Sequence, residues 1–381
     1  MSPGSRAARF AIVLAVIALA GCAGAPRESP RARAVFYPPP PDAPRIQHLA
    51  TFTGERDVAA PDSEFARFVV GEDTAAGQLR QPYGVALYGS KLYVADSKAP
   101  GLAIFDLAQR RFSLMTGSGH GRMKRPINVT IDRDGTKYIT DTGRDQILVY
   151  DRDDRFVSAL GNEAQTRPVD IAICGERLCV VDIKNHQVQV LDKRSGKVLS
   201  RFGKPGSRPG ELFQPTNIAV GPDGDLYVVD TGNFRVQRFT ADGRFLRSYG
   251  EVGSTPGSFA RPKGIALDKA GRLYVVDSAF QNVQVFDNAG RLLLHFGETR
   301  EAFDGLSLPA ALRIDYDGAE QFRRRAAPDF EIEYVIMVAS QFGPNKIDVF
   351  GFGRRRGLAY PAEEKRLTQP SATGASAPPA R

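Results

Sequence analysis

The sequence predicts an all-β fold, a six-bladed β-propeller built from four-stranded antiparallel blades. Similar segments begin at regularly spaced prolines, 44, 42, 47, 47 and 47 residues apart. Each segment contains four short β-rich stretches separated by turns such as Asp-Gly and Ala-Gly. Stretches such as residues 226–229 are apolar on both faces, which is typical of a sheet packed between two other sheets. The six opening prolines are Pro82, Pro126, Pro168, Pro215, Pro262 and Pro309.

The best-preserved repeats begin at Pro215 and Pro262 and contain LYVVD followed by RVQRF or NVQVF. This pattern resembles the NHL repeat family over residues 79–353, which implies the propeller fold and leaves the function open. Five repeats end their second strand with an aspartate that we expect to accept backbone N–H groups, whereas Ser340 replaces it in the sixth. These aspartates are Asp96, Asp141, Asp182, Asp230 and Asp277.

The sixth repeat runs out at residues 347–350, which form a third strand without a fourth. Residues 45–54, RIQHLATFTG, look like an isolated fourth strand. We therefore expect an N-terminal strand to complete the sixth blade and to cover an edge that would otherwise stay open. The predicted propeller domain spans residues 45–358.

The N-terminus predicts export and lipidation. Residues 1–10 carry two arginines and no acid, and the ten apolar residues that follow are too few to span a bilayer. Leu19, Ala20, Gly21 and Cys22 resemble a bacterial lipobox, which implies a signal peptide at 1–21 and acylation of Cys22. An ordinary signal peptide with a chance cysteine is the alternative. Because Ala23 stands where an aspartate would retain the protein at an inner membrane, the resemblance implies the outer membrane, facing the periplasm or the cell surface.

Two segments flank the predicted propeller. Residues 22–44, with prolines at 38–41, are expected to form a stiff tether, and residues 359–381 a disordered tail. The net charge of +8 is only mildly positive, and export argues against nucleic acid as a partner.

Cys174 and Cys179 flank the turn of the first hairpin in the third repeat. A four-residue loop would place them opposite each other, within reach of a disulfide in an oxidising compartment. Two buried free thiols remain the alternative. A metal site is not expected, because no further cysteine or nearby histidine completes it.

The residues two positions after each proline should face the propeller axis. Three consecutive blades place Asn128, Asp170 and Asn217 there, a set of oxygen ligands that could hold Ca²⁺ or orient a polar ligand. Ordinary hydrogen bonding around a wet channel is the alternative. No cofactor is otherwise indicated.

Resemblance to propeller enzymes finds little support in the residues. The amidating lyases place zinc-binding histidines directly after the blade prolines, and no histidine stands at those positions here. Gluconolactonase-type propellers also need an acidic residue where this chain has Gly84. The positions after the prolines hold Tyr83, Ile127, Val169, Thr216, Lys263 and Ala310.

Two arginine runs, on the face opposite the channel mouth, could form a patch for phosphate-bearing lipid headgroups or an acidic partner. Solvated surface charge is the alternative. The six residues are Arg323, Arg324, Arg325, Arg354, Arg355 and Arg356.

The sequence thus favours a membrane-anchored envelope lipoprotein whose propeller binds a protein, peptide or glycan without catalysis. The second hypothesis is a metal-dependent hydrolase or lyase acting through Asn128, Asp170 and Asn217. A structural role in a larger envelope complex is the third.

Overall fold

The computed structural model describes residues 34–58, 77–161 and 165–360, and these described residues form one compact unit. The lipobox residues Leu19, Ala20, Gly21 and Cys22 lie outside the described residues, as do residues 361–381 of the predicted tail. Within the described part of the chain, no helix is both long and apolar enough to span a membrane.

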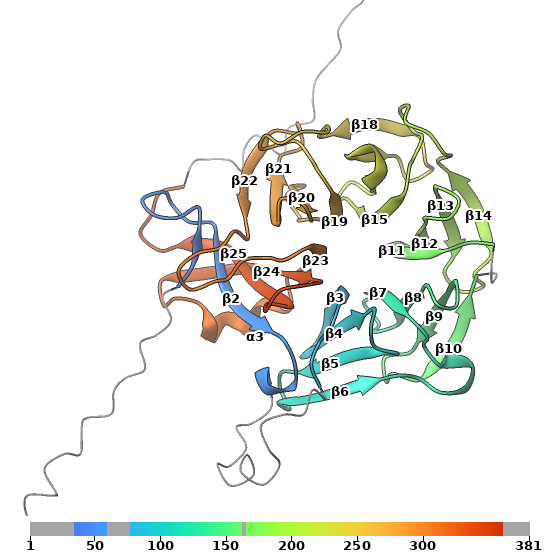
Figure 1. Cartoon of the computed structure of the whole chain (residues 1–381), viewed down its shortest axis with the longest axis horizontal. Helices are drawn as coiled ribbons and strands as arrows, with labels where there is room; N and C mark the ends of the chain where they lie inside the picture. Colours follow the sequence, from blue (N-terminus) through green and yellow to red (C-terminus); the bar gives the residue numbers. More distant parts are fainter. Residues whose placement is uncertain (1–33, 59–76, 162–164, 361–381) are drawn as a thin grey trace, which may run out of the picture. The chain divides into compact units, whose positions relative to one another are not determined.

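Six antiparallel sheets stand around a central axis, which confirms the predicted six-bladed propeller (Figure 1). In each blade the strand that begins at the proline is innermost. Blade 1 comprises β3 (Pro82–Tyr88), β4 (Lys91–Asp96), β5 (Leu102–Asp106) and β6 (Arg111–Met115). Blade 2 comprises β7 (Pro126–Ile131), β8 (Lys137–Asp141), β9 (Gln146–Tyr150) and β10 (Phe156–Leu160). Blade 3 comprises β11 (Pro168–Cys174), β12 (Arg177–Asp182), β13 (Gln187–Asp192) and β14 (Val198–Phe202).

The remaining blades follow the same order. Blade 4 comprises β15 (Pro215–Val220), β16 (Leu226–Asp230), β17 (Arg235–Phe239) and β18 (Phe245–Tyr249). Blade 5 comprises β19 (Pro262–Leu267), β20 (Leu273–Asp277), β21 (Asn282–Phe286) and β22 (Leu292–Phe296). Blade 6 comprises β23 (Pro309–Asp315), β24 (Phe330–Ser340), β25 (Ile347–Arg355), β2 (Ile46–Phe52) and β1 (Phe36–Tyr37).

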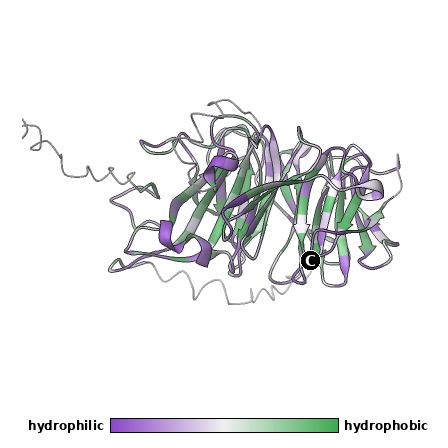
Figure 2. Cartoon of the chain, turned by 90° about the horizontal axis from the view of Figure 1, so that it is seen from below, coloured by the Kyte–Doolittle hydropathy of each residue, from purple (hydrophilic) through white to green (hydrophobic). Residues whose placement is uncertain are grey.

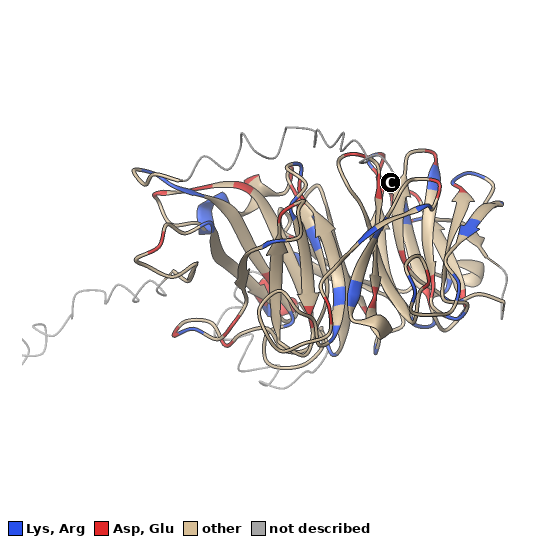
Figure 3. Cartoon of the chain, turned by 90° about the horizontal axis from the view of Figure 1, so that it is seen from above, with Lys and Arg blue, Asp and Glu red and all other residues tan. Residues whose placement is uncertain are grey.

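The core lies between neighbouring blades, so both faces of the middle strands are apolar (Figure 2). Strand β16 is buried at every position, whereas the outermost strand β6 is largely exposed. Charged residues lie mainly in the loops and at strand ends (Figure 3). The two-sided apolar pattern seen in the sequence therefore reflects sheets that cannot be stable alone.

The N-terminal strand closes the ring, as predicted. Strand β2 pairs antiparallel with β25, from Ile46 opposite Phe352 to Phe52 opposite Ile347. The buried Asp348 carboxylate on β25 accepts a hydrogen bond from the Thr51 hydroxyl at 2.6 Å. This pairing covers the edge of the sixth blade with the beginning of the domain.

The chain folds against the ring earlier than residue 45. Strand β1 pairs with β2, although residues 36–37 fall in the segment predicted to be a stiff tether. Tyr37 is fully buried, packs against Phe296 and Phe350, and donates a hydrogen bond to the Glu298 carbonyl. The proline run therefore forms the turn between β1 and β2 rather than an extended spacer. Burial of the Tyr37 side chain holds β1, directly before the prolines, against the ring.

The first hairpin of blade 6 carries an insertion between β23 and β24, which contains α3 (Ala319–Phe322) and the 3₁₀ turn η4 (Arg323–Arg325). Phe322 is buried against Phe52, in the core between blades 6 and 1. The insertion therefore seals the junction between the last blade and the first.

Candidate functional site: the channel mouth

The mouth face is the side where the innermost strands begin and the second strands end. Each strand-end aspartate is buried there and accepts hydrogen bonds from the backbone just before the blade proline. Asp141 accepts the N–H groups of Lys124 at 2.7 Å and Arg125 at 2.9 Å. In blade 6 the Ser340 hydroxyl accepts the Ser307 N–H at 3.3 Å instead. These aspartates act as structural caps, the role expected of them from the sequence.

The caps fix a ring of side chains around the channel entrance. We call the two residues before each blade proline, which are residues 80–81, 124–125, 166–167, 213–214, 260–261 and 307–308, the mouth ring. The mouth ring contains five cations and no acid. All five are exposed, and they are Arg80, Lys124, Arg125, Arg167 and Arg261. Of these, Arg167 forms an ion pair with Asp145 at 2.9 Å.

Below the mouth ring, two side chains cross the channel. The Tyr83 hydroxyl of blade 1 donates to Asn217 Oδ1 of blade 4 at 3.3 Å. Arg313 of blade 6 reaches Asp170 of blade 3, with an Nη2–Oδ1 distance of 2.8 Å. Because both links join opposite blades, they close the channel at this level. Blade 1 carries Gly84 beside this network, where a Cβ would lie only 2.3 Å from the Asn128 side chain.

The structure brings together the three predicted axial residues, Asn128, Asp170 and Asn217, all buried. The Asp170 carboxylate accepts from both asparagine amides, at 2.7 and 3.0 Å, and from two backbone N–H groups. The oxygens of Asn128 and Asn217 accept from the Val129 N–H and the Tyr83 hydroxyl. Since Arg313 already neutralises the single carboxylate, this donor set does not fit Ca²⁺ or a catalytic metal.

Lys263, near the start of β19 in blade 5, lies over the Tyr83 ring of blade 1, with its Nζ 5.3 Å from the ring centre. Burial, together with the positive charge of Arg261, lowers the pKa of Lys263 to about 8. No carboxylate pairs with it among residues 34–58, 77–161 and 165–360. Burial, and then the charge of Asp170, raises the pKa of the Tyr83 hydroxyl, which therefore remains a hydrogen-bond donor. The Tyr83 ring therefore lies below the Lys263 amine, which has no carboxylate partner among the described residues.

Apolar side chains lie among the cations of the mouth face. Phe213 is 44% exposed, and its ring stacks on His186 with 5.2 Å between the centroids. Phe342 of blade 6 is 51% exposed. Aromatic residues and arginines together are characteristic of protein interfaces.

The structure joins Cys174 and Cys179 by a disulfide with a Cα–Cα distance of 6.2 Å. The expected geometry of the hairpin was wrong, because the turn has two residues rather than four. Cys174 pairs with Arg177 and Cys179 with Ala172, so the cysteines are diagonal neighbours on adjacent strands.

The two arginine triplets are largely neutralised, which the sequence prediction did not foresee. Arg323 pairs with Glu320, and the other triplet pairs with acids of the facing strand β24 and of the segment just before it. Among the residues that the structure describes, Arg324 and Arg325 form no ion pair, and Arg325 lies over the Phe52 ring. The second set of pairs is Arg354–Glu333, Arg355–Asp329 and Arg356–Glu331. The net charge of the predicted patch for anionic surfaces is therefore much smaller than its six arginines suggest.

Sequence reasoning missed the role of Arg313, Tyr83 and Lys263. Tyr83 and Lys263 were noted only as positions without histidine. Arg313 lies two residues beyond the axial position Ala311, and the same periodicity could have placed it at the channel. Among the described residues, no three His, Cys, Asp or Glu side chains gather as a metal site.

The comparisons with known proteins agree on the fold. The sequence model of the NHL repeat matches residues 214–239, in blade 4. A protein of unknown function from Bacteroides thetaiotaomicron is 17% identical, with a TM-score of 0.56 over 80% of this chain and 75% of that chain. A gluconolactonase from Xanthomonas campestris is 16% identical, with a TM-score of 0.53 over 80% and 98%. A calcium-binding protein, regucalcin, from Agrobacterium tumefaciens is 14% identical, with a TM-score of 0.51 over 73% and 92%. At these identities the likeness concerns the fold alone.

Proposed function

Because this chain is a six-bladed β-propeller of the NHL-repeat type, we propose that it binds an acidic segment of a partner protein on its mouth face. The observation that carries the proposal is the mouth ring, with five cations and no acid around a channel that side chains close. Because the Tyr83–Asn217 and Arg313–Asp170 links cross the channel, we place the ligand across the mouth surface rather than inside the channel.

The chemistry of the mouth favours a peptide over an acidic glycan. Cations alone would suit either ligand. The exposed rings of Phe213 and Phe342 add apolar contacts, which a peptide matches with its own apolar side chains. The backbone beneath the ring is held by buried aspartates, so little ordering is needed on binding.

We further propose that the propeller is tethered to the outer membrane through an acylated Cys22. The resemblance of residues 19–22 to a lipobox supports this proposal. Replacement of Cys22 with alanine should move the protein from the membrane fraction to the soluble or unprocessed fraction. Unchanged fractionation of the processed protein would contradict the tether.

The pH dependence of binding tests the mouth site. Below about pH 8 Lys263 is protonated and attracts the acidic ligand, and above it the charge is lost. Affinity for poly-L-glutamate should fall about tenfold between pH 7 and pH 9.5 if the ligand raises the pKa of Lys263 by about one unit. Lys263→Met should abolish this change while arginine-dependent binding remains, as measured by isothermal titration calorimetry.

The same substitution should not reduce stability. Because the folded-state pKa of Lys263 is lowered, the unfolded chain binds more protons between about pH 8 and 10.5, so this group adds stability as pH rises. Lys263→Met should therefore keep or raise the melting temperature at pH 7. If the affinity of the wild-type protein for poly-L-glutamate did not change with pH, the proposed contact between Lys263 and the acidic ligand would be contradicted.

A further inference from the structure

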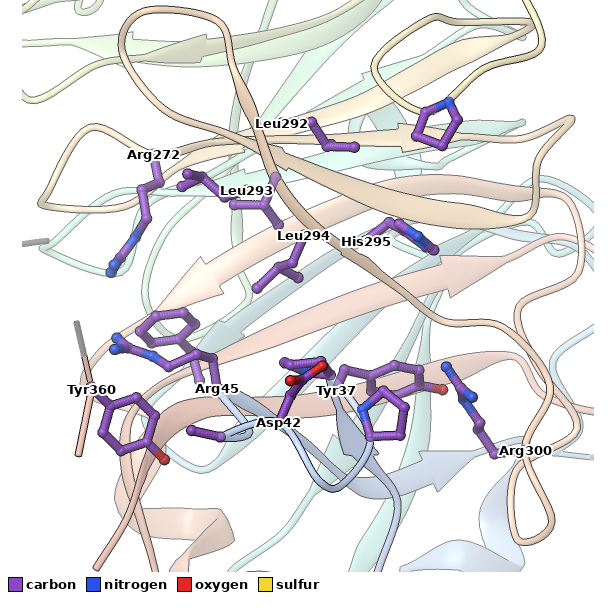
Figure 4. Close-up of a pocket in the computed structure, with 16 residues that line it drawn as sticks. Tyr37, Asp42, Arg45, Arg272, Leu292, Leu293, Leu294, His295, Arg300 and Tyr360 are labelled. Carbon is purple, nitrogen blue, oxygen red and sulfur yellow. The ribbon is translucent and has the colours of Figure 1, made fainter. Parts of the chain in front are cut away.

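A pocket of about 730 Å³ lies between the outermost strand of blade 5 and the N-terminal segment of blade 6 (Figure 4). The outermost strand of blade 5 forms one wall with residues 292–295. The segment from Tyr37 to Arg45, between β1 and β2, forms the opposite wall. Figure 4 shows Leu294 of β22 facing this segment across the pocket, with Leu292 farther from it. The volume is in the range that holds a small molecule.

Two guanidinium groups in the pocket have no carboxylate partner among the described residues. Arg45 lies over Phe352 and Tyr360, with its Cζ 4.5 and 5.1 Å from the ring centroids. Arg300 lies 5.2 Å from the Tyr37 ring centroid. The Nε atoms of both arginines are buried and form no hydrogen bond within the protein. Aromatic rings thus hold these cations, and an anion would complete them.

The other residues with basic or acidic side chains that line the pocket are Arg272, Asp42 and His295, and the His295 ring is bonded to the Glu298 carboxylate. Arg272 is neutralised by Asp268, with Nε 2.5 Å from Oδ2. Asp42 is exposed and lies between the positions of Arg45 and Arg300 in Figure 4. A single anionic group therefore fits next to one of the unpaired arginines better than at the middle of the pocket.

The wall opposite the arginines is apolar. Leu293 is 39% exposed, and Leu292 and Leu294 on either side of it are partly buried. Burial of apolar ligand surface against these side chains favours binding. The pocket therefore combines an apolar surface with unpaired cations.

We propose that this pocket binds an amphiphilic anion, a molecule with an apolar chain and a phosphate or carboxylate head. The chain lies along Leu292–Leu294 and the head contacts Arg45 or Arg300. Guanidinium groups suit both heads because they donate two parallel hydrogen bonds to them. This site is independent of the mouth face and of its acidic ligand.

Titration calorimetry of the Ala34–Arg381 protein with monomeric dodecyl phosphate tests the proposal, because the described residues of this segment form a compact unit. We expect saturable binding at one site. Inorganic phosphate and dodecyl maltoside should each bind at least tenfold more weakly, because each supplies only the head charge or only the chain. Equal binding of inorganic phosphate or of the neutral amphiphile would overturn the proposal.

Four variants locate the site. Leu293→Asp and Arg45→Gln should each weaken binding about tenfold or more. Asp42→Asn should strengthen it, because the change removes a negative charge from the lining of the pocket. Leu199→Asp is the matched control, since Leu199 is 52% exposed on the outermost strand of blade 3. Asp42 is exposed, so the gain tests the proposal even if Arg45→Gln fails to fold. Unchanged affinity in Asp42→Asn and Leu293→Asp would overturn it.

Vesicles distinguish a bilayer from a free amphiphile as the source of the ligand. If phosphatidylglycerol vesicles sediment the protein and Leu293→Asp prevents this, the ligand is a membrane lipid. If only monomeric dodecyl phosphate binds, with the same response to Leu293→Asp, the ligand is a free amphiphile. Vesicle binding that ignores both Leu293→Asp and Arg45→Gln would count against the pocket.

Discussion

Asp170→Ala should lower the free energy of unfolding of the Ala34–Arg381 protein by about 3–5 kcal/mol. The substitution removes the acceptor of five hydrogen bonds and leaves the Arg313 guanidinium, whose side chain is 19% exposed, without its counter-charge. A buried charge without a partner costs more than the pair itself contributes. Denaturant unfolding followed by circular dichroism measures the loss.

The double variant Asp170→Ala, Arg313→Met is the control. It removes the orphaned charge and should recover part of the lost stability, because an apolar side chain tolerates the buried position. A loss below about 1 kcal/mol for Asp170→Ala, or no recovery in the double variant, would mean that the two side chains do not close the channel as described.

Reversal of three mouth-ring charges, Lys124→Glu, Arg125→Glu and Arg261→Glu, should weaken binding of poly-L-glutamate about 100-fold at low salt. Each reversed contact costs roughly 1 kcal/mol in a solvent-exposed setting, and about 3 kcal/mol corresponds to that factor. The backbone of all three residues stays bonded to the caps Asp141 and Asp277, so the fold should persist. Fluorescence anisotropy of a labelled poly-L-glutamate measures the affinity.

The matched control reverses three exposed arginines on the opposite face, Arg110, Arg133 and Arg152. These lie in loops that follow first or third strands. They should change the affinity only a few-fold, since charges beyond a Debye length are screened. Equal loss in both triple variants would mean that net charge, and not the mouth ring, governs binding. A heparin-like glycan that binds where poly-L-glutamate does not would replace the peptide as the ligand class.

The fold could be predicted because six repeats carry the same local pattern. The prolines, the two-sided apolar strands and the Gly-containing turns each point to the same blade, and the missing fourth strand at residues 347–350 points to closure by the N-terminus. Strand β1 escaped prediction because two residues are too few for a pattern and the prolines that follow are typical of an extended spacer.

The site could be predicted only in part. Asn128, Asp170 and Asn217 were correctly grouped, because equal positions in neighbouring blades meet at the axis. The links from Tyr83 and Arg313 join opposite blades, and side-chain reach across a ring is not encoded in a repeat. The sequence did not reveal the ion pairs of the arginine triplets for a similar reason. Glu331 and Glu333 become partners of the second triplet only when strand pairing places them opposite it.

The most direct test of the mouth as the binding face is zero-length cross-linking of poly-L-glutamate carboxylates to lysine amines, located by mass spectrometry. Such a bond forms only where a ligand carboxylate contacts the amine. The account predicts cross-links at Lys98, Lys124 and Lys263, which lie on the mouth face. Cross-links at Lys197 and Lys269, which are exposed on the opposite face, with none at the mouth, would contradict it.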